Sequence, residues 1–359
     1  MAHLFVDISS HGFGHLAQTA PVLNELRLRL PDMRLTVRSG APREVLAKRI
    51  DGEFLHIAQA SDFGMVMANA VDVLAEPSAA AYRAFHQDWE AKVAHAASEM
   101  TALMPDLVLS NISYLTLAAA KAAGIPALAM CSINWADIYQ HYCGTFMEAK
   151  GIHAQMLDAY RSAKCFIRPQ PAMPMPGLNN THEIGPIALV GTDRRSEIKA
   201  GLGLKLHDKL VSIAMGGIQM RLPLENWPRI SNVRWLVPAS WGLSHPDAIT
   251  FETLGLPFVD VLRASDALIT KPGYGSFAEA ATNGIPVLYL RRRDWPEEPY
   301  LVDWLTLNGR CLEVERSQLE RGDINSPLQA LFAMPHQPPV APAGTDEAAE
   351  ILQARLDVA

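Results

Sequence analysis

Short apolar runs alternate along the chain with longer stretches in which apolar residues recur every three or four positions. The first run, residues 4–6, is followed by a polar loop over 9–15 and by an amphipathic stretch over 16–30. Spacing of three and four predicts one buried helix face, and short apolar runs bounded by turns predict buried strands. Such strand–helix alternation predicts a parallel sheet covered by helices on both faces.

The alternation runs through two series, which are separated by a proline-rich segment. Residues 169–177 can sustain neither a helix nor a central strand, because proline lacks the amide hydrogen that both require. The sequence therefore predicts an α/β protein with two doubly wound, Rossmann-like domains. The expected parts are an N-terminal domain over 1–168, a linker over 169–190, a C-terminal domain over 191–335, and a proline-rich linker with a final helix over 336–359. Beyond the first run, the predicted strands cover residues 34–38, 106–110, 125–130, 210–215, 234–237, 267–270 and 287–290.

Composition narrows the possible classes of protein. The chain has 359 residues, of which 49% are hydrophobic, so large buried cores are expected and a disordered chain is excluded. Its 31 basic and 38 acidic residues argue against a general nucleic-acid binder. No apolar run approaches the roughly 18 residues of a membrane helix, and no signal peptide is recognisable. The four cysteines form no CxxC pair, which favours a reduced, cytoplasmic protein.

The first candidate site is the loop that follows the first predicted strand. Gly12 and Gly14 allow a sharp turn and expose the start of the next helix, which favours an anionic or polar ligand. His11 and His15 flank that turn, and either imidazole can take up a proton near neutral pH. A plain turn with incidental histidines is the alternative, but two histidines on one such loop favour a site.

The same loop also permits a dinucleotide interpretation. Gly12, Gly14 and Ala17 match the pattern G-x-G-x-x-A. That interpretation requires an acidic residue at the end of the second strand, where this chain has Arg38. An arginine there would favour NADP, so an NADP-dependent enzyme is a weaker alternative.

A second glycine-bearing loop follows the strand predicted at residues 210–215. Gly216 and Gly217 allow the backbone to approach a phosphate closely. Arg221 adds a positive charge to this loop. From the loop alone, a plain turn is about equally compatible with these residues.

The third loop, residues 271–276, is the strongest phosphate-binding candidate. A strand ends, glycines turn the chain, and a helix is expected to begin near Ser276, so amide groups and the serine hydroxyl would point at a diphosphate. Glu279 could accept hydrogen bonds from a ribose diol, although Ser276 and Glu279 also fit a capping box. The candidate diphosphate ligands of this loop are Lys271, Gly273, Tyr274, Gly275 and Ser276.

A charged segment, residues 291–300, follows the next predicted strand. The carboxylates of Glu297 and Glu298 can bind sugar hydroxyls, and the arginines can pair with phosphate or with those carboxylates. No D-x-D pair occurs, so a metal-bridged diphosphate is not expected. We expect neither a metal site nor an organic cofactor.

Taken in order, these motifs resemble the GT-B glycosyltransferases, including the bacterial lipid-linked N-acetylglucosaminyltransferase of peptidoglycan synthesis. The family pattern has a glycine-rich loop that residues 216–219 match, Gln219 included, and an N-terminal Gly-His that Gly14 and His15 match. The sequence is more similar to the glycosyltransferase-like N-terminal region of plant L-arabinokinases. That region also pairs a His-Gly-Phe-Gly-His loop with a Gly-Tyr-Gly motif and an Arg-Arg-Asp…Glu-Glu-Pro segment. The kinase half of those proteins has no counterpart in this chain.

The resemblance implies a GT-B fold of two domains facing a central cleft. The C-terminal domain would bind a nucleotide diphosphate sugar, with Glu279 on the ribose and Glu297 or Glu298 on the donor sugar. The family's deprotonating histidine falls on His15, and His11 is a second candidate. The family often has Asp-Gln or Gln-Gln at the Glu-Glu position, so the donor sugar stays open.

The implied activity is metal-independent transfer of a sugar, from a donor expected to be UDP-linked, to a hydroxyl of a small-molecule, lipid-linked or peptide acceptor. Two alternatives have the same fold, namely a non-catalytic nucleotide-sugar binding protein and a sugar-nucleotide epimerase. Residues 115–130 and 133–147 are candidates for the acceptor pocket, including Trp135, Tyr139 and His141. Such aromatic residues belong more often to a core, so sugar stacking on Trp135 is the weaker interpretation.

Overall fold

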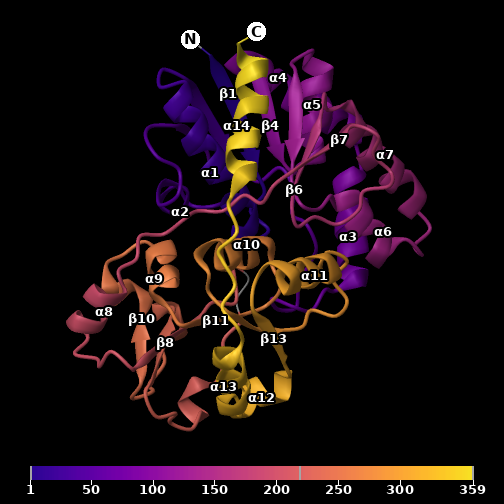
Figure 1. The fold of residues 1–359 in the computed structure, drawn as a ribbon. Helices are drawn as coiled ribbons and strands as arrows, with labels where there is room; N and C mark the ends of the chain where they lie inside the picture. Colours follow the sequence, from indigo (N-terminus) through magenta and orange to yellow (C-terminus); the bar gives the residue numbers. More distant parts are fainter. Residues whose placement is uncertain (1, 218–219, 358–359) are drawn as a thin grey trace. The chain divides into compact units, whose positions relative to one another are not determined.

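The computed structural model describes residues 2–217 and 220–357. Contacts divide the chain into two compact units, and each unit holds one parallel sheet (Figure 1). Unit 1 comprises Met1–Ala68, Asp72–Ile187 and Pro342–Ala359, and unit 2 comprises Asn69–Val71 and Ala188–Ala341. The predicted α/β class with two doubly wound sheets is confirmed.

The sheet of unit 1 has seven strands in the order β3-β2-β1-β4-β5-β6-β7. On β1, Leu4, Val6 and Ile8 belong to one apolar cluster, while Asp7 takes the alternate position on the other face, as strand periodicity requires. The strand order reverses between β1 and β4, which is where ligands bind in sheets of this type. The strands are β1 His3–Ile8, β2 Arg34–Arg38, β3 Leu55–Ile57, β4 Leu107–Asn111, β5 Ala127–Met130, β6 Phe166–Pro169 and β7 Thr181–Ile184.

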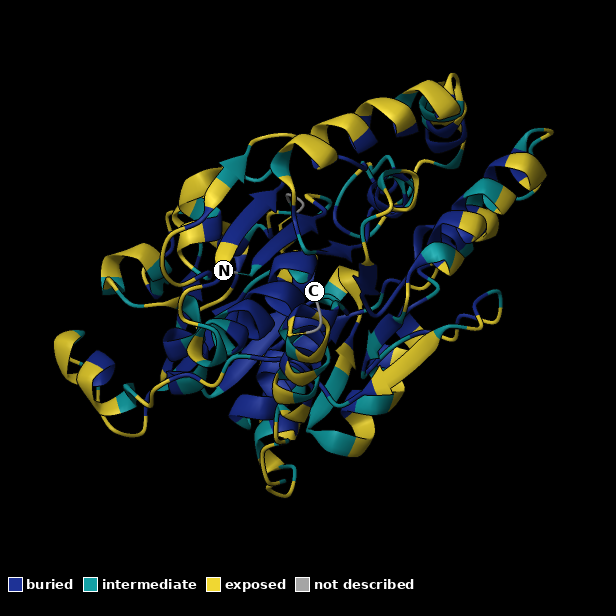
Figure 2. Cartoon of the chain, turned by 90° about the horizontal axis from the view of Figure 1, so that it is seen from above, coloured by how far each residue is buried: buried dark blue, intermediate teal, exposed yellow. Residues whose placement is uncertain are grey.

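Helices cover both faces of this sheet. In Figure 2 the central strands are dark blue and the outer helix faces are yellow, so the core lies between sheet and helices. The long helix predicted over 16–30 is present and begins earlier, at Phe13. The helices of unit 1 are α1 Phe13–Arg29, α2 Arg43–Ala47, α3 Ala75–His86, α4 Trp89–Leu103, α5 Tyr114–Ala123, α6 Trp135–Cys143, α7 Ala149–Ser162 and α14 Ala343–Leu356.

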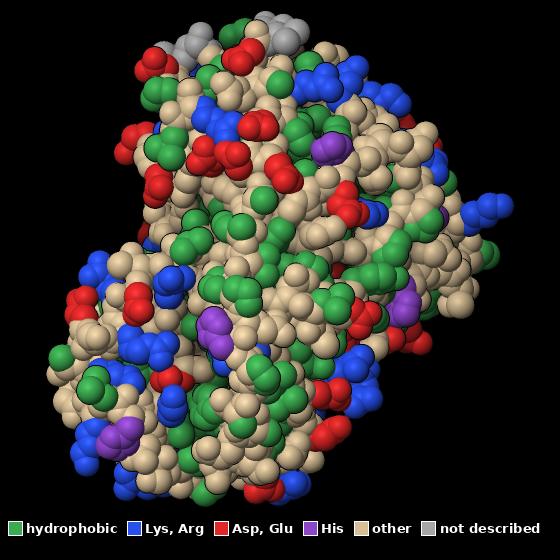
Figure 3. Space-filling model, viewed as in Figure 1, with side chains coloured by type: hydrophobic (Ala, Val, Ile, Leu, Met, Phe, Trp, Pro, Cys, Tyr) green, Lys and Arg blue, Asp and Glu red, His purple; other side chains and the backbone are tan. Residues whose placement is uncertain are grey.

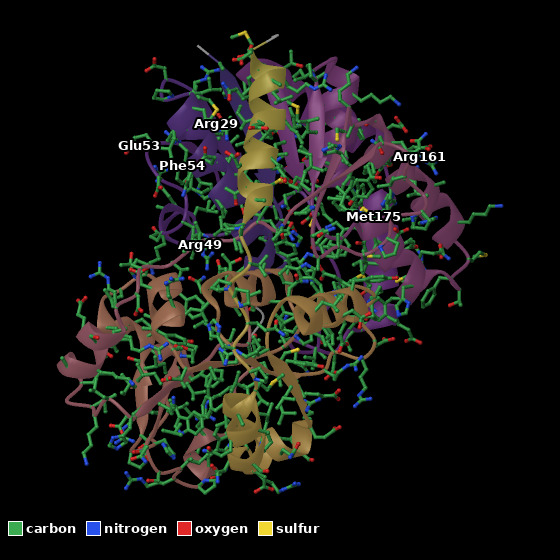
Figure 4. The ribbon with its side chains drawn as sticks, in the orientation of Figure 1. Arg29, Arg49, Glu53, Phe54, Arg161 and Met175 are labelled. Atoms are coloured by element: carbon green, nitrogen blue, oxygen red, sulfur yellow. The ribbon has the colours of Figure 1, made fainter. Side chains whose placement is uncertain are left out.

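The last helix packs on the first unit. Leu352 of α14 is fully buried within the apolar cluster of the first sheet. Arg29 of α1, labelled beside α14 in Figure 4, pairs with Asp346 and lies 3.9 Å from Glu350. Basic and acidic side chains are accordingly interspersed over α14 in the space-filling view (Figure 3). The predicted final helix exists, and it belongs to unit 1 rather than to a separate segment behind the second domain.

The segment predicted as a linker over 169–190 contains a strand. Residues 170–177 form neither a helix nor a strand, but β7 then pairs in parallel with β6, with Thr181 opposite Phe166. Three of the four residues of β7 are exposed. A short edge strand with one partner and a polar face lacks the apolar run on which the prediction relied.

The sheet of unit 2 has six strands in the order β10-β9-β8-β11-β12-β13. Strand β12 alternates strictly, with Val287 and Tyr289 in one apolar cluster and Leu288 and Leu290 in the other. Both faces are therefore buried, as expected for a parallel sheet. The strands are β8 Lys209–Ile213, β9 Val233–Val237, β10 Ala248–Thr250, β11 Ala267–Thr270, β12 Val287–Leu290 and β13 Cys311–Val314. The helices are α8 Arg195–Gly201, α9 Phe258–Ala264, α10 Tyr274–Asn283, α11 Glu298–Asn308, α12 Arg316–Arg321 and α13 Asn325–Ala333.

Across the described residues, every helix is too short or too polar to cross a bilayer.

Candidate functional site

The loop between β1 and α1 leaves the start of the helix uncovered. Gly12 is the N-cap residue, no side chain caps the helix, and its first turn holds no acidic residue. A Cβ atom built at Gly12 or Gly14 would meet no atom within 4 Å. The two glycines therefore leave open space beside the helix start, where backbone amides favour a polar or anionic group.

His15 occupies the third position of α1, and its side chain is held in a fixed orientation. Its Nδ1 lies 2.8 Å from Oδ1 of Asn111, the last residue of β4. The residue is 7% exposed, and desolvation lowers the pKa of His15 to about 4, against the opposing effect of the Asn111 hydrogen bond. Among the described residues, Nε2 has no partner. At neutral pH the ring is therefore uncharged and can accept a proton at Nε2.

His11 is held by a different loop. Its Nδ1 lies 3.2 Å from the carbonyl oxygen of Phe63, and its ring meets the Trp135 ring edge-on at 5.0 Å. A Cβ atom at Gly64 would lie 2.5 Å from the His11 ring, so only glycine fits at that close approach. The structure thus places both predicted histidines at the carboxyl end of β1, in separate hydrogen-bonding environments.

Behind the histidines lies a buried carboxyl group that the sequence analysis did not identify. Asp62 accepts hydrogen bonds from Ser9 Oγ at 2.7 Å and from Trp135 Nε1 at 3.0 Å. Desolvation, together with the nearby Asp7 carboxylate, raises the pKa of Asp62 to about 7, although both hydrogen bonds oppose that shift. The Trp135 ring is fully buried, so the suggestion that it stacks on a sugar is wrong.

The weaker NADP interpretation loses its key residue. The Arg38 guanidinium is buried and lies 2.6 Å from the Asp7 carboxylate. It also donates to Thr116 Oγ1 at 2.6 Å. Because this guanidinium is buried and bonded to Asp7 and Thr116, it cannot bind the 2′-phosphate that distinguishes NADP from NAD.

In unit 2 the third loop has the predicted strand–turn–helix form, with a correction to where the helix begins. The N-cap residue of α10 is Gly273, and the first intrahelical bond joins Phe277 N to Gly273 O at 3.0 Å. Ser276 is therefore already helical, and no side chain caps the helix, so the capping box predicted for Ser276 and Glu279 is wrong. The amides of the first turn, Gly275 and Ser276 included, point out of the helix start.

Lys271, the first residue of the third loop, lies beside Gly216 of the second loop. A Cβ atom built at Gly216 would lie 3.6 Å from Lys271 Cε, and one at Gly273 would lie 3.5 Å from Nζ. Desolvation, together with the nearby Arg292 guanidinium, lowers the pKa of Lys271 to about 7, although the Glu297 carboxylate opposes that shift. The ends of β8, β11 and β12 thus bring two cationic groups and one carboxylate together.

The two predicted carboxylates of the charged segment, Glu297 and Glu298, have different partners. Glu297 accepts from Trp295 Nε1 at 3.1 Å, and the Arg292 guanidinium stacks 3.5 Å from the centre of the Trp295 ring. Glu298 is fully buried and pairs with Arg291 at 2.5 Å. Of the two carboxylates, Glu297 is the one whose charge acts on Lys271.

The remaining predicted residues are placed as follows. Arg221 pairs with Glu225 at 2.9 Å and donates to the carbonyl oxygen of Trp241, so its charge is already engaged. Gln219 lies outside the described residues. Tyr274 and Glu279 are buried in α10, and Gly217 follows Gly216 after β8. Within the described residues, no group of three His, Cys, Asp or Glu side chains could hold a metal ion.

Sequence reasoning missed Asn111, the partner of His15, although a signal was present. Asn111 comes directly after the strand predicted at 106–110, and β4 pairs with β1 in the sheet. A polar residue at the end of a buried strand, next to the strand that leads into the histidine loop, lies at the binding edge of such a sheet.

Comparison with known proteins places this geometry in a fold family. No family model matches the chain. L-arabinokinase from Arabidopsis thaliana is 26% identical over 348 residues, covering 88% of this chain. The chain spans 30% of the length of that relative.

Solved structures match over the whole chain. The calicheamicin glycosyltransferase CalG4 superimposes with a TM-score of 0.66 at 15% identity, over 99% of this chain and 98% of that one. The chain has the GT-B fold. UGT89C1 of Arabidopsis thaliana, complexed with UDP, has a TM-score of 0.58 at 15% identity over 99% of this chain and 100% of its own. The glycosyltransferase VinC, in complex with dTDP, has a TM-score of 0.54 at 15% identity, over 99% of this chain and 95% of that one.

These superpositions establish the GT-B fold, and at 15% identity they do not by themselves establish an activity. The resemblance expected from the ordered motifs is confirmed for the GT-B fold and for a distant similarity to L-arabinokinase. In the GT-B chain described here, the β1–α1 loop of unit 1 and the β11–α10 loop of unit 2 carry the candidate residues.

Proposed function

We propose that the protein is a glycosyltransferase that moves a sugar from a nucleotide diphosphate donor to an acceptor hydroxyl. The proposed donor is a UDP-sugar. The observation that carries the proposal is His15, a neutral imidazole held at Nδ1 with Nε2 unpartnered among the described residues, at the start of α1 in a chain with the GT-B fold. The acceptor is a small molecule, a lipid-linked compound or a peptide.

His15 acts as the general base. The acceptor oxygen attacks the anomeric carbon, the bond from that carbon to the diphosphate oxygen breaks, and the acceptor proton moves to His15 Nε2. A pKa of about 4 makes His15 a weak base. A weak base suffices because the hydroxyl becomes strongly acidic as its oxygen bonds to the anomeric carbon, so the proton leaves late in the reaction.

The β11–α10 region holds the diphosphate. Amides at the start of α10, Gly275 and Ser276 included, donate to phosphate oxygens, and the helix dipole adds positive potential. Lys271 and Arg292 supply charge next to them, which stabilises the departing diphosphate without a metal ion. Support comes from the structurally similar proteins that were solved with UDP and with dTDP.

Two carboxylates bind the rest of the donor. Glu279 accepts hydrogen bonds from the ribose, and Glu297 binds the donor sugar. Glu298 takes no part in sugar binding in this proposal, because its carboxylate is paired with the Arg291 guanidinium at 2.5 Å.

A donor screen tests the proposal. The melting temperature is measured with UDP-, dTDP-, GDP- and ADP-sugars, and nucleotide release is then measured for each stabilising donor, with and without candidate acceptors. Stabilisation together with nucleotide release, including slow hydrolysis without an acceptor, supports a transferase. Stabilisation without any turnover would instead identify a nucleotide-sugar binding protein. Release of nucleotide together with an epimerised sugar in the absence of acceptor would identify an epimerase.

A further inference from the structure

A chain of buried amide side chains leads away from the ring of His15. Asn111 Oδ1 lies 2.8 Å from His15 Nδ1, and Asn111 Nδ2 donates to Gln18 Oε1 at 3.2 Å. Gln18 Nε2 in turn donates to Ser132 Oγ at 2.8 Å. The three partners are each at most 2% exposed, and none carries a charge.

Three separate elements supply this chain of hydrogen bonds. Gln18 lies three residues after His15 on α1, so both side chains are on the same face of the helix. Asn111 ends β4, and Ser132 follows β5, which pairs with β4. The sheet and the helix therefore fix the amides from two sides.

Such a chain has a direction. A side-chain amide has an acceptor oxygen at one end and a donor nitrogen at the other, so turning Asn111 over by itself sets its oxygen against Gln18 Oε1 and breaks that bond. With Asn111 Nδ2 bound to Gln18, the oxygen of Asn111 faces the imidazole. A carbonyl oxygen can only accept, so the ring nitrogen opposite it must carry the hydrogen.

We infer that Asn111 and Gln18 are positioning residues whose amides hold His15 with Nδ1 protonated and Nε2 left as the proton acceptor. The catalytic use of this arrangement rests on the function proposed above for His15. The tautomer follows from the orientation in which the structure places the Asn111 and Gln18 amides, and it involves contacts of unit 1 alone. Other enzymes use a carboxylate to orient a catalytic histidine, whereas a neutral amide does so here.

In the described part of the chain, two hydrogen-bond contacts reach His15 Nδ1, and the one to Asn111 is the shorter. The Cys131 sulfur lies 3.7 Å from Nδ1, and the Trp135 ring lies 5.8 Å from the imidazole, centre to centre. The Asp62 carboxyl is bound by Ser9 and Trp135 instead of by His15. Within the described residues, no carboxylate lies within 4 Å of His15, so no ion pair competes with Asn111.

The tautomer can be read directly by nitrogen NMR of the full chain labelled with [15N]histidine. The His15 ring signals are identified by their loss in His15→Gln. We expect Nδ1 to resonate as the protonated nitrogen and Nε2 as the unprotonated one at pH 7. The opposite pattern, or an average of both, overturns the inference whatever the enzymatic activity.

Substitution of Gln18 separates positioning from packing. Gln18→Met keeps the side-chain volume and frees Asn111 to turn over, so both tautomers become populated and kcat falls about ten- to a hundredfold with KM little changed. Gln18→Glu keeps an acceptor for Asn111 Nδ2 and accepts from the Ser132 hydroxyl, so it restores the wild-type tautomer. An unchanged His15 spectrum in Gln18→Met overturns the inference.

Asn111→Asp gives a second, independent signature. The carboxylate keeps the acceptor and adds a negative charge, so the pKa of His15 and the acid limb of the pH–rate profile rise together by about one to three pH units. Asn24→Asp, the same substitution in the second half of α1, is the matched control and leaves both values unchanged. If the tautomer is as inferred and His15→Gln still turns over normally, the proposed function fails and the tautomer assignment stands.

Discussion

At the scale of single residues, the candidate site holds titratable groups whose pKa values differ from the ordinary values because the fold removes them from water. Burial lowers the pKa of His15 to about 4 and of Lys271 to about 7, and it raises that of Asp62 to about 7. Each shift favours the uncharged form, as desolvation requires. The candidate residues therefore carry less charge at neutral pH than the sequence indicates. A charged ligand that binds beside one of these side chains will shift its pKa and change its protonation state.

Lys271 provides a test through the pH dependence of nucleotide affinity. Only its ammonium form attracts a diphosphate, and the charged fraction falls about tenfold per pH unit above pH 7. We expect the Kd for UDP to rise on the order of ten- to thirtyfold between pH 6.5 and 8.5, as measured by isothermal titration calorimetry.

Two variants of Lys271 isolate its contribution from the titration of UDP itself. Lys271→Arg stays charged throughout this range, so its Kd should depend much less on pH. Lys271→Met should bind weakly at every pH. A wild-type pH dependence that matches that of Lys271→Arg would exclude this role for Lys271.

Asp62 provides a test through protein stability. Between pH 4 and 7 the folded state keeps the Asp62 proton while the unfolded state loses it, so this residue contributes stability at low pH that disappears as the pH rises through 7. Relative to Asp62→Asn, the wild-type free energy of unfolding should decrease by about 1–3 kcal/mol from pH 5 to pH 7.5. Urea unfolding at several pH values measures this difference. A difference between the two proteins that does not vary with pH contradicts the shifted pKa.

The candidate residues that the sequence predicted lie mostly on glycine-bearing loops, and the candidates that it missed meet those loops only through long-range packing. His15 and Lys271 were identified because each lies on a loop that directly follows a strand. Asn111 is far from His15 along the chain and meets it only through the pairing of β1 with β4. Glu298 looked like a sugar ligand, because nothing local reveals that Arg291 folds back onto it.

At the scale of elements, α1 and α10 share one design. Each begins at a glycine N-cap directly after a buried strand, and neither has a side-chain cap. A helix start without a cap leaves amides available for a ligand and forgoes about 1 kcal/mol of helix stability. Both helices are therefore less stable at their first turn, where the proposed function requires backbone amides that can donate to a ligand.

Gly14 tests this trade-off. It lies within α1 with open space around it, so Gly14→Ala should raise the free energy of unfolding by about 0.5–1 kcal/mol. The added methyl group narrows the space beside His15, so KM for the acceptor should rise. Gly151→Ala in α7, also surrounded by open space, is the matched control and should stabilise without changing KM. Equal kinetic effects of both variants would show that Gly14 serves the helix alone.

Element prediction succeeded where apolar periodicity was strong. The strands expected over 267–270 and 287–290 are β11 and β12 with the same bounds. The prediction of elements failed at β7, a polar edge strand. It also failed at the start of α10, where the N-cap is Gly273 and the helix therefore begins before Ser276. Edge strands and helix starts depend on tertiary partners and local backbone angles, which hydrophobic patterning does not encode.

At the scale of the whole molecule, the chain builds two parallel sheets and returns at its end to the first. Unit 1 combines residues from both ends of the sequence, since α14 completes the core that α1 and the first sheet begin. The GT-B fold and the distant similarity to L-arabinokinase extend over most of the chain. In the proposed function, unit 1 supplies the base and unit 2 supplies the diphosphate ligands.

The most direct test of this division of labour is the effect of His15→Gln on turnover and on nucleotide affinity, measured with the best donor of the screen. We expect kcat/KM to fall by about 10²–10⁴, the usual loss for a general base, while the Kd for the nucleotide stays within about twofold of the wild-type value. His95→Gln, at an exposed histidine of α4, is the matched control and should change neither quantity. Wild-type turnover in His15→Gln would contradict the assignment of His15 as the base, and so would a loss of nucleotide affinity that accounts for the whole effect.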